Sequence, residues 1–148
     1  MTMLQNELWL KQRQIKTAAV ANKREGDSLL ADNKKKRGVV TLTSGLQYEG
    51  LKAADGKKPT DADTVEVNYR GTLTDGTEIL NTYKAGQPAT FKVTETIPGL
   101  TEVLKLMPLG SRWHVFIPSQ LAYGERGMGR FIGSNATLIY EFELLGIK

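Results

Sequence analysis

The chain contains no cysteine, which excludes disulfides, thiolate metal sites and cysteine nucleophiles. No apolar run approaches the roughly 20 residues that a helix needs to cross a bilayer. The first residues lack the basic and apolar segments of a secretory signal, so we expect a soluble chain. The single histidine, His114, has no serine or carboxylate partner at a recognisable spacing, which favours a structural role over a catalytic one. No metal constellation emerges, and no metal or cofactor is expected.

Positive charge is concentrated in the first quarter of the chain. The 148 residues carry a net charge of +4. Residues 1–37 hold nine basic against four acidic residues, whereas the remainder holds eleven basic against twelve acidic ones. The basic run 34–37 falls where a helix is expected to end, and cations there complement the helix dipole. A solvated helix face is therefore favoured, and a nucleic-acid partner, which charge alone would support, is not expected.

The same region has the composition of a long helix. Residues 4–36 contain no proline and one glycine, and are rich in strong helix formers. They predict one long helix or two abutting ones, stopped by Gly38. The apolar positions are too irregular for a coiled-coil seam, so the helix is expected to stand partly free. Leu4, Leu8 and Trp9 are its candidates for self-association.

From residue 39 onward, turn signals separate short alternating segments. Residues 64–70 and 112–117 alternate apolar and polar side chains, as antiparallel strands do. Apolar residues at 100, 103, 104 and 107 form one stripe of a short helix. The sequence predicts an α+β domain over residues 38–148, with an antiparallel sheet wrapped on one short helix. Residues 1–37 are predicted to form a separate helical appendage.

A glycine-punctuated loop and a final strand form the most specific pattern. Gly124, Gly127, Gly129 and Gly133 are expected to let the loop turn through positive φ angles. Residues 138–144 then alternate as a strand with one buried face. Sequence landmarks recur at six places: Val67–Leu73, Asp75–Thr77, Gly86–Phe91, Ile97–Gly99, Leu121–Gly124 and Asn135–Leu138. This trail resembles FKBP-type peptidyl-prolyl cis-trans isomerases, and the helix followed by Thr43–Tyr48 resembles their Mip-like bacterial branch.

The resemblance implies an FKBP-like fold and an enzyme that isomerises Xaa-Pro bonds without nucleophile, metal or cofactor. The barrier of about 18–20 kcal/mol is largely lost amide resonance, and a dry pocket that holds the bond twisted lowers it. The resemblance assigns catalytic positions to Tyr69, Tyr123 and Ile97, whose main-chain N–H would donate to the substrate carbonyl. The substrate-binding positions that it implies are Ile79, Leu80, Phe91, Thr96, Leu100, Ile132 and Tyr140.

Four of these positions depart from the family pattern. An aromatic wall becomes Ile79 and the pocket carboxylate becomes Leu80, while the family tryptophan is Leu100 and an aliphatic residue is Thr96. One preorganised electrostatic group can contribute about 10²-fold to a rate, so a reduced rate is expected. Binding is expected to survive, because leucine leaves no buried charge to satisfy. A packing role for Leu80 is weighed equally with a pocket-lining one.

Two functions of this pocket stay open. One is an isomerase that assists protein folding, and the alternative is a chaperone or adaptor module that binds proline-containing or apolar segments with little turnover. The resemblance implies proline-containing polypeptides as partners, weakened binding of macrolide immunosuppressant-type ligands, and a homodimer through an N-terminal region that is absent or truncated here. It also implies a periplasmic or cell-surface location, with the cytoplasm as the alternative.

Overall fold

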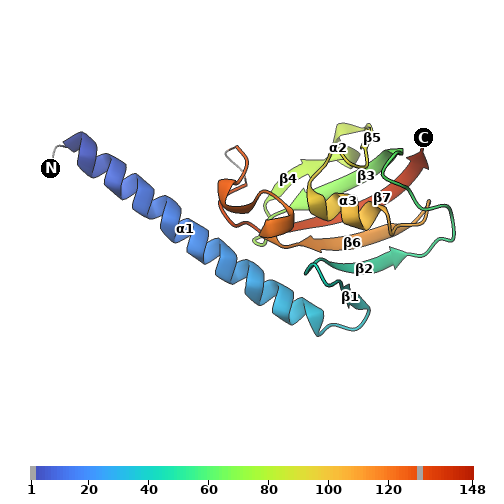
Figure 1. Cartoon of the computed structure of the whole chain (residues 1–148), viewed down its shortest axis with the longest axis horizontal. Helices are drawn as coiled ribbons and strands as arrows, with labels where there is room; N and C mark the ends of the chain where they lie inside the picture. The colour runs from blue at the N-terminus through green and yellow to red at the C-terminus, as the bar shows by residue number, and fades with distance from the viewer. Residues whose placement is uncertain (1–2, 130–131) are drawn as a thin grey trace.

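The computed structural model describes residues 3–129 and 132–148, with side chains from Ala18 onward. A single continuous helix, α1 (Met3–Lys34), precedes the strands and extends well beyond the sheet at its N-terminal end (Figure 1). Among the described helices, none combines the length and the hydropathy that a bilayer crossing requires. The side chains of Leu4, Leu8 and Trp9 fall outside the described part, so their expected self-association stays a prediction.

The strands form one seven-stranded antiparallel sheet. Its order is β1 (Val39–Thr41), β2 (Gln47–Lys52), β6 (Arg112–Ile117), β7 (Leu138–Ile147), β3 (Thr64–Thr72) and β4 (Glu78–Asn81). The free edge of β3 is shared, because β4 pairs with its C-terminal end and β5 (Ala89–Lys92) with its N-terminal half. The helical segments that follow α1 are α2 (Thr82–Ala85), α3 (Pro98–Leu104), η1 (Ser119–Leu121) and η2 (Gly124–Arg126). This confirms the predicted fold class.

The core lies between the sheet and α3. Burial along β7 alternates from Leu138 to Leu144, as the sequence pattern predicts. The α3 stripe is also buried, with Val103, Leu104 and Met107 fully inaccessible and Leu100 nearly so. The helix is shorter than this stripe, since it ends at Leu104. Met107 reaches the core from the turn that follows, where its N–H donates to the Val103 carbonyl.

The C-terminal half of α1 packs against the rest of the chain. Asn33 Nδ2 donates to Gln47 Oε1 at 2.8 Å, and both side chains are only 3% exposed. Gln47 Nε2 in turn donates to the Leu30 carbonyl at 2.9 Å. The helix ends at Lys34, four residues before Gly38. Gly38, at φ +90°, therefore turns the chain into β1 and does not cap the helix as expected.

Candidate active site

Tyr69 lies at the centre of an aromatic cluster on the α3 side of the sheet. Its ring centroid is 5.2 Å from that of Phe142, 5.9 Å from that of Tyr140 and 6.4 Å from that of Phe91. These residues come from β3, β7 and β5, which are hydrogen-bonded neighbours. Offset and edge-on pairs of this kind are favourable beyond their burial. Adjacent strands thus build a rigid aromatic floor.

A glycine in β3 makes room for one of these rings. A Cβ atom on Gly71 would lie 2.7 Å from Cε1 of Tyr140 and 3.2 Å from Cγ1 of Ile79. Any side chain at Gly71 would therefore displace the Tyr140 ring. Leu80 is the strand partner of Gly71. Ile79 and Leu80, the two residues of β4 that differ from the family pattern, therefore border this part of the floor.

The N-terminus of α3 forms another side of the site. Ile97 is the residue before the helix, with extended backbone angles, and Pro98 occupies the first helical position. The Ile97 carbonyl accepts from the N–H groups of Leu100 and Thr101. A Cβ on Gly99 would lie 2.6 Å from Cγ2 of Ile117 in β6, so only glycine allows this close approach. Gly99 thereby fixes where Ile97 sits relative to the sheet.

The loop between β6 and β7 supplies Tyr123 and Ile132. Ile132 is 8% exposed, and its backbone N–H and C=O both bond to Met128, at 3.1 and 2.7 Å. Gly124, Gly127 and Gly129 have φ angles of +56°, +65° and +58°. The expectation of a positive φ was wrong for the fourth glycine, at position 133, which lies outside the left-handed region. A non-glycine residue, Asn135 with φ +60°, makes the corresponding turn.

Burial keeps the phenols of the cluster neutral. It raises the pKa of Tyr69, and the nearby Tyr123 adds to this effect. The pKa of Tyr140 is raised more strongly, first by burial and then by Tyr123 and Tyr69. Desolvation disfavours the charged phenolate, and a phenolate would also be repelled by its neighbours. At neutral pH the hydroxyls of Tyr69 and Tyr140 are therefore available as hydrogen-bond donors.

The structure brings most of the predicted site residues together. Nine of the ten belong to the core cluster or pack against it: Tyr69, Ile79, Leu80, Phe91, Ile97, Leu100, Tyr123, Ile132 and Tyr140. Thr96, the tenth, is half-buried beside Ile97 and outside that cluster. Their roles toward a ligand stay predictions. Sequence reasoning missed Gly71 and Gly99, although a glycine inside a strand or beside a helix start signals a close approach.

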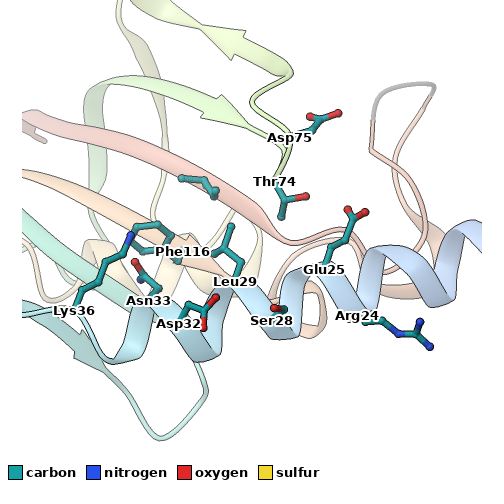
Figure 2. A pocket seen from close by; sticks show the side chains of 11 residues that line it. Arg24, Glu25, Ser28, Leu29, Asp32, Asn33, Lys36, Thr74, Asp75 and Phe116 are labelled. Carbon is teal, nitrogen blue, oxygen red and sulfur yellow. The ribbon is translucent and has the colours of Figure 1, made fainter.

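A groove lies on the opposite face of the sheet from the aromatic cluster. It has a volume of about 840 Å³ and lies between α1 and the sheet, bordered by Leu29 and Asn33 of the helix and by Phe116 and Ile139 of β6 and β7 (Figure 2). Its lining includes both basic side chains, Arg24 and Lys36, and acidic ones, Glu25, Asp32 and Asp75, so it has no single charge character. Within residues 3–129 and 132–148, no three acidic or histidine side chains gather as metal ligands would.

A family model described as FKBP-type peptidyl-prolyl cis-trans isomerase matches residues 55–145. The chain belongs to this family. A second model, described as the domain amino terminal to FKBP-type peptidyl-prolyl isomerase, matches residues 1–49, which include α1. The FKBP resemblance read from the loop and its landmarks is thereby confirmed.

Individual relatives agree with the family assignment. Outer membrane protein MIP of Legionella longbeachae is 54% identical over 130 residues, which are 88% of this chain and 56% of that protein. FkpA of Aeromonas hydrophila, an FKBP-type peptidyl-prolyl cis-trans isomerase, is 49% identical over 88% of this chain and 48% of its own. The crystal structure of FkpA from Escherichia coli matches with a TM-score of 0.89 and 36% identity, covering 100% of this chain and 74% of that one. The chain thus spans about half the length of the relatives found by sequence.

Proposed function

We propose that this FKBP-family chain binds proline-containing polypeptides over the aromatic floor at Tyr69 and isomerises their Xaa-Pro bonds with a low rate. One observation carries the proposal: Tyr69, between Phe91 and Tyr140, forms an aromatic surface that packs into the same hydrophobic core as Ile97, the residue before α3. Such a surface fits a prolyl ring, which is compact, apolar and has no N–H group to satisfy.

The proposed chemistry is rotation about one amide bond. The apolar walls exclude water and so disfavour the charge-separated planar amide, which lowers the rotational barrier. The Ile97 N–H holds the substrate carbonyl, while the neutral hydroxyls of Tyr69 and Tyr140 offer further donors near the twisted bond. No fixed negative charge orients these hydroxyls, because Leu80 occupies the position of the family carboxylate. We therefore expect binding to be retained better than turnover.

The second candidate function is a chaperone or adaptor module that uses the same pocket with little turnover. Leu80 and Leu100 favour it, since both replace functional side chains of the family pattern by apolar ones. Leu100 is 3% exposed, and its side chain offers a smaller contact surface than an indole would. Macrolide-type ligands of the family would then also bind, with reduced affinity.

The relatives bear on location and assembly. One of them is named an outer membrane protein, and on that ground we place this chain in the bacterial envelope, at the periplasmic or cell-surface side. The match of residues 1–49 to the domain that precedes such isomerases supports dimer formation through that region. The N-terminal half of α1 extends beyond the sheet, and we propose it as the place of that contact (Figure 1).

The proposed activity can be tested by exchange NMR on a panel of Xaa-Pro peptides at increasing protein concentration. We expect weak but measurable acceleration of cis-trans exchange, together with shifts of the Tyr69 and Tyr140 ring signals. Binding without acceleration at saturating protein would reject the isomerase and favour the adaptor. A peptide with alanine in place of proline is the control, and equal shifts with it would reject prolyl recognition altogether.

A further inference from the structure

The loop that carries Tyr123 and Ile132 is closed on itself. Met128 and Ile132 exchange two backbone hydrogen bonds across the loop, at 2.7 and 3.1 Å. The N–H of Asn135 donates to the Gly124 carbonyl at 2.8 Å, which joins the loop's beginning to its end. A shift of the segment at Asn135 would therefore be passed through this bond to Gly124, the neighbour of Tyr123, and along three residues of the chain to Ile132.

The segment that follows Ile132 contacts α1 at three successive points. Asn22 Nδ2 donates to the Ser134 carbonyl at 3.0 Å. Asn135 Nδ2 donates in the opposite direction, to the Ala19 carbonyl of α1, at 3.4 Å. These bonds join residues more than 100 positions apart in the sequence. Figure 1 shows the loop lying beside the middle of α1, far from either end of the helix.

The third contact is a close approach that only glycine permits. A Cβ on Gly26 would lie 2.0 Å from Oγ1 and 3.0 Å from Cβ of Thr137, which is 4% exposed at the start of β7. Residues 19, 22 and 26 lie on one face of α1, because they follow the i, i+3, i+7 spacing of a helix. The helix therefore meets the loop along a continuous stripe, which we call the α1 clamp: Ala19, Asn22 and Gly26 against Ser134, Asn135 and Thr137.

We propose that Asn22 and Gly26 are positioning residues for the pocket: through the α1 clamp they set the places of Ile132 and Tyr123. The residues that they contact, Ser134 and Thr137, lie between Ile132 and strand β7, so the loop carries their effect to the pocket residues. Displacing a pocket wall by about 1 Å can cost up to 10²-fold in rate. The inference deepens the proposed isomerase function and adds a specific role for the helix that precedes the domain.

Two substitutions in the full chain test the clamp. Asn22→Ala removes the donor to Ser134, and Gly26→Ala inserts a methyl group against Thr137. Alanine is a stronger helix former than glycine, so the second change displaces the loop without weakening α1. Val20→Ala and Ser28→Ala are the matched controls, because both positions are exposed on the same helix. The double variant Gly26→Ala with Thr137→Ala relieves the shortest of the new contacts and should restore part of the loss.

The first readout does not depend on isomerase activity. It measures the side-chain NMR signals of Tyr123 and Ile132, and amide hydrogen exchange over residues 123–137. We expect shifted signals and faster exchange in Asn22→Ala and Gly26→Ala, with the controls unchanged. The second readout is the KM for an Xaa-Pro peptide, expected to rise by about tenfold with a smaller change in kcat.

The two readouts separate this inference from the proposed function. If the wild-type chain has no isomerase activity but Asn22→Ala and Gly26→Ala still show the shifts, the result supports the clamp and rejects the activity. Unmoved Tyr123 and Ile132 signals in both clamp variants, or equal shifts in the controls, would overturn the clamp whatever the activity.

Discussion

Leu80 and Tyr140 lie on opposite sides of strand β3, because both are paired with the same residue, Gly71. Gly71 has no side chain to separate them. The position that the family pattern gives to a carboxylate is therefore separated from the buried Tyr140 by one strand, which has only Gly71 at that point. This relationship makes Leu80 the residue whose replacement should change turnover most.

We expect Leu80→Asp to raise kcat/KM for prolyl isomerisation by about tenfold or more, since a carboxylate there would accept hydrogen bonds from the neutral hydroxyls and orient them. Exchange NMR on one Xaa-Pro peptide measures the change. Leu80→Asn is the matched control, because asparagine has nearly the same shape as aspartate but carries no charge. Equal rates for the aspartate and asparagine variants would show that the charge is not what the pocket lacks.

The buried pair Asn33–Gln47 should contribute measurably to stability. Asn33→Ala leaves Gln47 Oε1 buried without its donor, which should lower the free energy of unfolding by about 1–3 kcal/mol in urea denaturation. Asp32→Ala, an exposed neighbour on α1, is the control. The double variant Asn33→Leu with Gln47→Met should recover part of the loss, because neither new side chain brings a buried polar group that needs a partner. A cost no larger than that of Asp32→Ala would contradict this account.

His114 should make the protein less stable in mild acid. Burial is the main cause that lowers its pKa; Lys36 adds to this, while Glu49 and Glu141 oppose it. The unfolded chain, with an ordinary pKa near 6.5, then binds more protons than the folded protein as the pH falls below about 7. The free energy of unfolding should therefore decrease between pH 7.5 and 5.5. Urea denaturation at both values checks this, and His114→Gln should show a smaller decrease; an unchanged slope would exclude His114 as its source.

Removal of residues 1–36 should leave a folded but less stable domain. The sheet and α3 bury their own core, whereas α1 adds one buried polar pair and the α1 clamp. We expect dispersed amide NMR signals and a cooperative urea transition. The free energy of unfolding should be lower than that of the full chain by about 1–3 kcal/mol. Loss of signal dispersion would instead mean that α1 belongs to the folding unit, and the predicted boundary at residue 38 would be wrong.

Features that depend on residues close together in the chain could be predicted from the sequence, whereas contacts between distant segments could not. The alternation in β7 and the apolar stripe that begins in α3 are local patterns, and both are present in the structure. The docking of α1 was not predictable, because Asn22 and Gly26 meet partners more than 100 residues away. A glycine in a helix read alone signals only weak helix propensity.

The burial of Phe116 illustrates the same limit. In an alternating strand the residues beside Val115 are expected to face away from the core, yet Phe116 is 6% exposed. It lies on the outer face of the sheet, in the groove that α1 borders (Figure 2). The pocket residues were easier to name, since they follow the family motif position by position, but their spatial grouping depends on Gly71 and Gly99.

The contact of Gly26 with Thr137 also gives α1 a fulcrum. About 35 Å of helix separates Gly26 from Met3. A tilt of about 5° at the fulcrum would carry the far end of the helix through about 3 Å. Conversely, a force applied at that far end, by a second subunit or by a large client, would act with a greater force on the contact at Thr137. The length of the helix thus converts a small rotation at Thr137 into a larger movement at the far end of α1.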